Sequence, residues 1–208
     1  MTIKIIGMVI VAYLLGAIPS GLWIGQTFYH KDIRKLGSGN IGTTNTFREL
    51  GPKAGVVVLL MDVLKGTLAA SQPYLLGVSH SVNPLLIGIF ASLGHTFSVF
   101  DHFHGGKTEA TKAGVLLAYN PPPFSPSCAN FITTLLLTSM ASCASIVGIT
   151  SIFIIALCEH DLILSCVAGI LTALVLWRHK SNIIRIITGN ESLVSFGLVY
   201  YLKQKHHK

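Results

Sequence analysis

Long apolar runs separated by short polar loops constrain this chain more than any other feature. The first three runs cover residues 3–25, 54–76 and 84–100. Each is long enough to cross a hydrocarbon core of about 30 Å as a helix that rises about 1.5 Å per residue. Only helices and closed barrels satisfy backbone hydrogen bonds in lipid, and these runs lack the strict alternation of barrel strands. They predict an all-α, polytopic helical integral membrane protein.

The composition supports the same class of protein. Of the 208 residues, 51% are hydrophobic and 11% are charged, and the mean hydropathy is +0.64, whereas soluble domains carry about 25% charge. The net charge of +7 comes mostly from loops beside the apolar runs, which is the pattern of cytoplasmic loops in membrane proteins. We therefore expect membrane lipids around the chain, no nucleic-acid partner, and one membrane-embedded domain over residues 1–208; the oligomeric state is left open.

Three later apolar stretches bear on the topology, and they cover residues 113–137, 140–157 and 162–177. The loops around Ser38, Lys107 and His179 are basic, which places all three on the cytoplasmic side. An even number of crossings must separate two loops on one side, so one later stretch must turn within the membrane or form a half-length helix. We expect about five to seven membrane helices, including half-length ones, and an N-terminus outside.

A polar, glycine-rich loop, GSGNIGTTNTFR, occupies residues 37–48. Glycines allow the backbone to approach a ligand and turn its amides inward, Ser38 adds a hydroxyl donor, and Arg48 adds a planar fork suited to phosphate. The loop therefore predicts an anion-binding site, although such a loop is as often a simple turn. The expected binding residues are Gly37, Gly39, Asn40, Gly42, Thr44 and Asn45.

Two further polar clusters carry groups that suit phosphate and acyl transfer. The first is Gly105, Gly106 and Lys107, and the second contains His179, Asn182, Arg185 and Glu191. Glycine amides and cations can bind anionic oxygens, and an imidazole can accept a proton. His179 and Asn182 are three residues apart and would share a helix face. Lipid headgroups explain a basic cluster at a membrane interface equally well.

Ionisable groups inside the apolar runs leave two interpretations open. Asp62 and Lys65 lie three apart on one helical face, where charges are costly, so they form either a structural ion pair or part of the site. His95 fits a hydrogen-bonded packing residue. His102 and His104 lack the cysteine or carboxylate partners that would complete a metal site, so neither metal nor cofactor is expected.

These segments resemble the three motif regions of one known family. GSGNIGTTN with Arg48, GHTFSVF followed by FHGGK, and RHKSNIIR with Gly189 and Glu191 resemble the PlsY family of membrane-embedded acyl-phosphate:glycerol-3-phosphate acyltransferases. The resemblance covers nearly the whole chain, in order. It implies a seven-helix fold in the bacterial inner membrane. It also implies transfer of a fatty acyl group from acyl phosphate to glycerol 3-phosphate, giving lysophosphatidate and phosphate in the first acylation of phospholipid synthesis.

By this resemblance, the active-site positions are Ser38, Arg48, Lys107, His179 and Asn182. An acyl phosphate is a mixed anhydride with a good leaving group, so no acyl-enzyme is required. His179 or a substrate phosphate would accept the hydroxyl proton, and the sequence leaves both open. The second motif departs from the family pattern at Thr108 and Glu109, where the family has a small residue and valine.

Two other functions fit parts of the sequence. The negative charge of Glu109 beside Lys107 is compatible with a diverged paralogue that binds glycerophosphate or lipid with little or no turnover. A small transporter would use glycine-broken helices and the charges of Asp62 and Lys65 to line a pathway. Transport predicts polar residues at membrane depth in both halves of the chain, whereas here most of them lie in loops.

Overall fold

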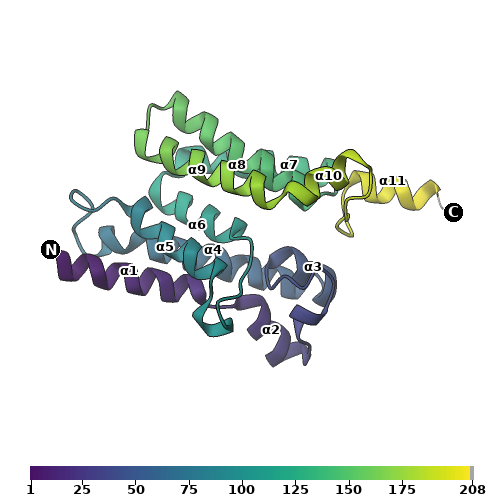
Figure 1. The fold of residues 1–208 in the computed structure, drawn as a ribbon, viewed down its shortest axis with the longest axis horizontal. Coiled ribbons are helices and arrows are strands. Elements are labelled where there is room, and N and C mark those ends of the chain that lie inside the picture. Colours follow the sequence, from purple (N-terminus) through teal and green to yellow (C-terminus); the bar gives the residue numbers. More distant parts are fainter. Residues whose placement is uncertain (207–208) are drawn as a thin grey trace. The chain divides into compact units, whose positions relative to one another are not determined.

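This computed structural model describes residues 1–206, without the side chains of Arg178 and His206. All regular elements in that range are helical (Figure 1). The all-α prediction is confirmed over that range. The chain divides into two compact units, Met1–Pro121 and a second that begins at Pro122. Each is described by itself.

The first unit begins with a broken helix. Helices α1 (Thr2–Ala17) and α2 (Ser20–Tyr29) meet at a bend of 43°. Pro19 explains the break because its ring cannot continue the helical hydrogen bonds. On either side, Gly16 lies against the backbone of Ala91 and Gly21 against the carbonyl of Ile41, so close that a Cβ would collide at either position. The bend is therefore packed tightly on both sides.

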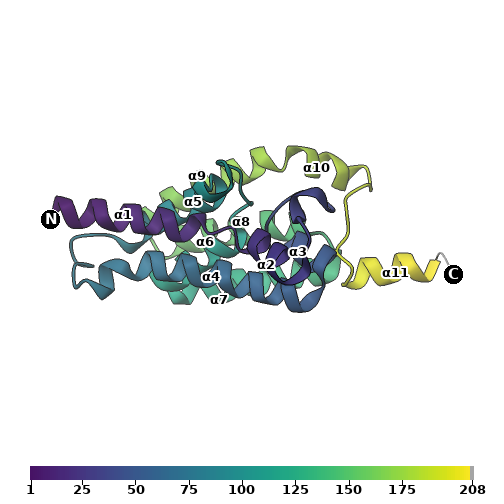
Figure 2. The ribbon, with the colours of Figure 1, turned by 90° about the horizontal axis from the view of Figure 1, so that it is seen from below.

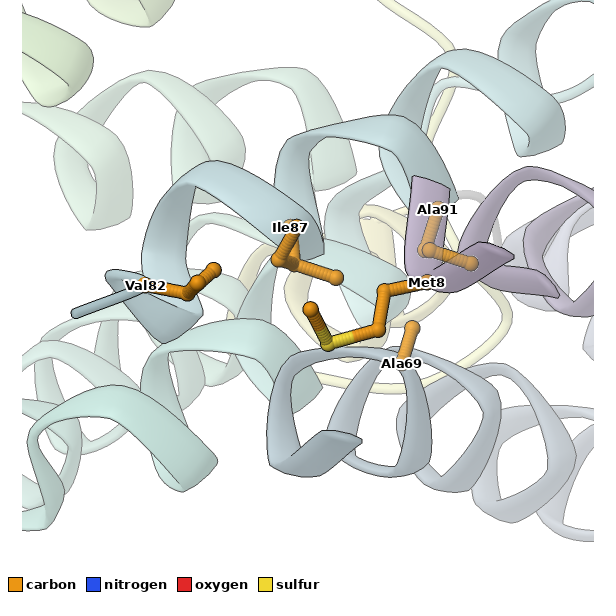
Figure 3. Close-up of a cluster of buried hydrophobic side chains, with 6 residues drawn as sticks. Met8, Ala69, Val82, Ile87 and Ala91 are labelled. Atoms are coloured by element: carbon orange, nitrogen blue, oxygen red, sulfur yellow. The ribbon is translucent and has the colours of Figure 1, made fainter. Parts of the chain in front are cut away.

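Helix α4 (Pro52–Leu75) is the centre of the first unit and packs against α1, α5 (Pro84–Thr96) and α6 (Glu109–Tyr119) (Figure 2). The short helix α3 (Thr43–Leu50) also lies on α4. A small apolar core joins the long helices, and Figure 3 shows Met8 reaching between Ile87 and Ala69. Two 3-10 turns, η1 (Ile33–Lys35) and η2 (Val99–Asp101), lead into the polar loops.

The second unit contains α7 (Pro121–Thr138), α8 (Ala141–Cys158), α9 (Leu162–Arg178), α10 (Lys180–Ile187) and α11 (Leu198–His206). Helices α8 and α9 pack side by side, and Asp161 caps α9 by accepting the Leu164 amide at 2.9 Å. Ser139, at φ 55°, turns the chain from α7 into α8. Its carbonyl accepts the Val194 amide and its hydroxyl oxygen accepts the Tyr200 amide, which anchors the C-terminal segment.

Among the described residues, three segments are long and apolar enough to cross a membrane: Pro52–Leu75, Pro84–Asp101 and Ala141–Cys158. Counting the bent pairs α1 with α2 and α9 with α10 as one span each gives up to five. The single stretch predicted over residues 113–137 is wrong, because the chain breaks at Asn120 into α6 and α7. Proline disfavours a helical conformation of the residue before it and suits the first turn of a helix; Asn120 is extended, and Pro121 starts a new helix. At 11 residues, α6 spans roughly 16 Å and is a half-length helix.

Candidate active site

Asn45 organises the glycine-rich loop from inside the first unit. Its side chain is 2% exposed. Its Oδ1 accepts the Ser38 amide at 3.0 Å, and its Nδ2 donates to the carbonyls of Ile33 and Leu36 at 3.3 and 3.0 Å. Gly37 lies at φ 53°, where a Cβ would collide with Asn45 and Glu49. Asn45 thus holds the loop in shape with all the polar atoms of its amide.

The backbone amides of this loop are largely used within the loop. Besides the Ser38 amide, that of Gly39 donates to Leu36 O at 2.9 Å and that of Gly42 to Asn40 Oδ1 at 2.8 Å. The amides of Gly39 and Gly42 are therefore engaged within the loop, whereas the sequence predicted that glycine amides would point toward a ligand. The loop instead presents side chains: Ser38 and Thr44 are exposed, and Arg48 is half-buried on α3.

Lys107 lies exposed at the end of a second loop, and this loop is pressed onto α5. The Gly106 amide donates to the His95 carbonyl at 3.0 Å. A Cβ at Gly105 would collide with the His95 carbonyl, and one at Gly106 would collide with the His95 ring. The two glycines are therefore required by a close approach to α5, which fixes the backbone immediately before Lys107.

Arg34 joins the two loops of the first unit. Its guanidinium donates to Asp32 through Nε at 2.9 Å and Nη2 at 2.8 Å, and to Asp101 through Nη1 at 2.6 Å. The hydrogen bonds from Arg34 lower the pKa of Asp32 to about 2, and those carboxylates raise the pKa of Arg34. Asp32 and Arg34 belong to the segment before the first loop and Asp101 to the segment before the second, so this bridge positions both loops together.

Glu109 is engaged by a cation on its own helix. Its Oε1 lies 2.9 Å from Lys112 Nζ, one turn along α6. Lys112 is buried and Glu109 is partly exposed. The carboxylate therefore neutralises a buried ammonium group, and the charge that motivated a diverged paralogue is offset within α6.

Thr108 adopts a backbone conformation that favours glycine. It is a β-branched residue at φ 63°, directly after Lys107, where L-residues pay roughly 1–2 kcal/mol. We expect Thr108→Gly to raise the free energy of unfolding by about 1 kcal/mol, since the relieved strain exceeds the chain entropy that glycine adds. Thermal unfolding in detergent measures this shift. Thr133→Gly, inside α7, is the control and should lower stability by about 1 kcal/mol; a loss of stability at both positions would contradict the strain at Thr108.

Glu191 gathers three partners in the second unit. Its Oε1 accepts hydrogen bonds from Ser142 Oγ at 2.7 Å and Asn182 Nδ2 at 2.8 Å, and its Oε2 accepts from Arg185 Nε at 2.9 Å. Burial alone would raise the pKa of Glu191, but these three donors lower it below its ordinary value. Glu191 therefore ties α10 to the start of α8.

His179 lies at the junction of α9 and α10, where the chain bends by 61°. Its ring is buried. Nδ1 lies 2.9 Å from the Val175 carbonyl. Because a carbonyl only accepts, Nδ1 carries the hydrogen of the neutral ring and Nε2 carries the lone pair. This tautomer suits proton acceptance through Nε2.

Asp62 and Lys65 form an ion pair with each other, with Asp62 Oδ1 2.7 Å from Lys65 Nζ. His95 is buried beside them, as a packing residue should be.

Within the described residues, no group of three histidine, cysteine or acidic side chains could hold a metal ion, and the four cysteines are free. Thus the first unit carries Ser38 and Lys107 on two loops joined by Arg34, with Arg48 on α3, and the second unit brings Asn182, Arg185 and Glu191 into contact.

Several of these residues had no signal in the sequence. Three of them, Arg34, Asp101 and Ser142, act through partners far along the chain, and only the charge of Arg34 and Asp101 hinted at pairing. Asn45 was expected to bind substrate, whereas its amide atoms contact the loop backbone. An asparagine seven residues after the serine that it fixes has no recognisable spacing rule.

Comparison with known proteins gives a consistent result. The sequence model of a family described as glycerol-3-phosphate acyltransferase matches residues 6–189. A glycerol-3-phosphate acyltransferase of Limosilactobacillus reuteri is 70% identical over 205 residues, covering 99% of this chain and 98% of the relative. Another, from Lactiplantibacillus plantarum, is 52% identical over 206 residues, covering 99% of each.

Two solved structures have a similar fold. Both are crystal structures of PlsY (YgiH), an integral membrane glycerol 3-phosphate acyltransferase. Its glycerol 3-phosphate form is 35% identical with a TM-score of 0.84, covering 95% of this chain and 98% of that one. The lysophosphatidic acid form is 34% identical with a TM-score of 0.81, covering 91% and 94%.

Proposed function

The chain belongs to the glycerol-3-phosphate acyltransferase family, and from that premise we propose that it transfers a fatty acyl group from an acyl phosphate to the sn-1 hydroxyl of glycerol 3-phosphate. The products are lysophosphatidate and inorganic phosphate, in the first acylation of phospholipid synthesis. The observation that carries the proposal is likeness over nearly the full chain to an enzyme whose solved forms are named for glycerol 3-phosphate and lysophosphatidic acid.

Ser38, Arg48 and Lys107 are the groups that we assign to the substrate phosphates. Two anionic substrates repel each other, so bringing them together requires cations and hydroxyl donors. Arg48 offers a planar fork and Lys107 a mobile ammonium group. The segments that carry these groups are shaped or flanked by Gly37, Gly39, Asn40, Gly42, Thr44, Asn45, Gly105 and Gly106.

His179 and Asn182 are assigned to the acceptor hydroxyl, with Arg185 and Glu191 supporting them. The hydroxyl oxygen attacks the acyl carbonyl carbon, the bond from that carbon to the phosphate oxygen breaks, and phosphate leaves. The hydroxyl proton passes to Nε2 of His179 or to the departing phosphate. Since phosphate is already a good leaving group, the protein contributes positioning and charge neutralisation more than covalent chemistry.

We assign the reaction to the cytoplasmic face of the bacterial plasma membrane, also called the inner membrane, on the charge of the polar loops. The basic residues Lys31, Arg34, Lys35, Arg48 and Lys53 lie in or beside the first polar segment, which the positive-inside rule assigns to the cytoplasm. Acyl phosphate would then come from the lipid phase and glycerol 3-phosphate from water. Chemical labelling of single cysteines placed in these loops, in intact cells and in lysed cells, tests this orientation.

Purified protein is expected to release lysophosphatidate and phosphate in equal amounts from palmitoyl phosphate and glycerol 3-phosphate. Absence of turnover would reject the proposal. We expect Glu109→Val to be no more active than the wild type and to be less stable, because it leaves Lys112 buried without its carboxylate. Activity gained in Glu109→Val over an inactive wild type would favour a diverged paralogue instead. Uptake of labelled glycerol 3-phosphate into vesicles without acylation would favour a transporter.

A further inference from the structure

A buried polar network lies at the break between α1 and α2, within the first unit. Lys65 Nζ lies 2.7 Å from Asp62 Oδ1 and donates to the Ile18 carbonyl at 2.8 Å. Ser20 Oγ donates to the same Asp62 oxygen at 2.8 Å. Asp62 is 2% exposed and Lys65 is 4% exposed, both in a helix apolar enough to span a membrane. Helices α2 and α4 and the break before α2 therefore meet at this ion pair.

The network supplies hydrogen bonds to backbone groups that lose their helical partners at the break. Pro19 interrupts the helical hydrogen bonds, so the Ile18 carbonyl needs other donors, and it receives Lys65 Nζ and the Ser20 amide. An unsatisfied carbonyl and an unpaired charge are both costly at membrane depth. A neutral apolar cluster would avoid the charges altogether, so the packing of the bend alone does not account for them.

His95 connects this network to the loop that carries Lys107. Its Nδ1 lies 3.9 Å from Asp62 Oδ1. On the other side of the ring, Nε2 faces Gly106 so closely that a Cβ there would collide with it, and the His95 carbonyl accepts the Gly106 amide at 3.0 Å. The ring thus lies between the buried carboxylate and the residue immediately before Lys107, and its own exposure is 6%.

We propose that Asp62, Lys65 and His95, with Ser20, are positioning residues that hold Lys107 in place for glycerol 3-phosphate. Asp62 and Lys65 fix the bend, the carboxylate lies beside the His95 ring without a hydrogen bond to it, and the ring and carbonyl of His95 fix Gly105 and Gly106. This inference rests on the proposed function, since it takes Lys107 as a ligand of the substrate phosphate. None of the four residues need contact substrate, and no proton passes along the network.

The test compares Michaelis constants with unfolding temperatures in purified full-length protein. His95→Asn removes the side chain that faces Gly106, and the double variant Asp62→Asn with Lys65→Met removes both buried charges at once, which avoids leaving either one unpaired. We expect each to lower kcat/KM for glycerol 3-phosphate by about 10- to 100-fold, mainly through KM. The KM for palmitoyl phosphate should stay within about twofold of the wild type, because the inference takes Lys107 to bind the phosphate of glycerol 3-phosphate.

The control is Thr67→Val, on the same helix. Thr67 Oγ1 donates to the Gly114 carbonyl at 3.0 Å and does not belong to the network. Its loss should lower the unfolding temperature while leaving both KM values unchanged. If the network only stabilised the fold, His95→Asn and the double variant would behave like Thr67→Val. A KM for glycerol 3-phosphate within twofold of the wild type in both network variants, once folded, overturns the inference.

A double-mutant cycle separates this inference from the proposed function. If His95 acts through Lys107, adding His95→Asn to Lys107→Ala should raise the KM for glycerol 3-phosphate no further than Lys107→Ala alone. Additive effects would overturn the positioning role. An unchanged KM in Lys107→Ala alone would instead remove Lys107 from the substrate site and so reject the proposed assignment. A raised KM in Lys107→Ala with no effect of the network variants rejects only the inference.

Discussion

Replacing Lys107 with alanine is expected to lower kcat/KM for glycerol 3-phosphate by about 100- to 1,000-fold, the range typical of removing one donor to a charged transition state. The unfolding temperature should change by no more than about 2 °C, because exposed side chains contribute little to stability. Lys107 is exposed, and the shape of its loop comes from Gly105, Gly106 and His95. The measurement is steady-state kinetics with palmitoyl phosphate, alongside thermal unfolding in detergent.

Two controls make the Lys107 result specific. Lys107→Arg keeps the positive charge and should retain more activity than Lys107→Ala, although the wider guanidinium fork will not place its donors at the same point. Lys53→Ala removes an exposed cation at the start of α4 and should leave kcat/KM unchanged. Equal losses in Lys53→Ala and Lys107→Ala would mean that the loops act only through overall positive charge, and full activity in Lys107→Ala would place Lys107 outside the substrate site.

The sequence was sufficient to predict the class of fold but not all of its breaks. Apolar length and loop charge predicted a helical membrane protein, because the bilayer imposes helix length and internal hydrogen bonding on any spanning segment. The parity of the loops predicted that one later stretch turns within the membrane or forms a half-length helix, and α6, with 11 residues, is of half length. The proline run at residues 121–123 indicated a rigid break inside the stretch 113–137, and α6 ends just before it, at Tyr119.

Candidate site residues were easier to name than to place. The three polar clusters stood out because polar and glycine-rich segments are rare in an apolar chain, which is a compositional signal. The roles of Asn45 and Glu191 depend on partners that no spacing rule supplies, such as Ser142, which is 49 positions from Glu191. Likewise, the sequence placed Asp62 and Lys65 on one face, but their contact with the Ile18 carbonyl depends on how α4 packs against the helix break.

Glu191 should contribute more to stability than its single charge suggests. In Glu191→Ala, Ser142 and Asn182 lose an acceptor in buried surroundings, and each unpaired group costs about 1–3 kcal/mol. We expect the free energy of unfolding to fall by about 3 kcal/mol and kcat/KM to fall on the order of 100-fold, since Asn182 would no longer be held. Ser142→Ala, which removes one donor but leaves the carboxylate, should lower stability by about 1 kcal/mol.

The pH dependence of stability shows whether the Glu191 carboxylate holds the second unit together or only binds substrate. The folded pKa of Glu191 lies below its ordinary value of 4.5, so its stabilising effect is complete above pH 4.5 and is lost as the pH falls through the lower folded value. Thermal unfolding without substrate should therefore show a smaller difference between wild type and Glu191→Gln at pH 3 than at pH 7. Equal stability of the two proteins at pH 7 would contradict the organising role, because a residue that acts only on substrate leaves the free protein unchanged.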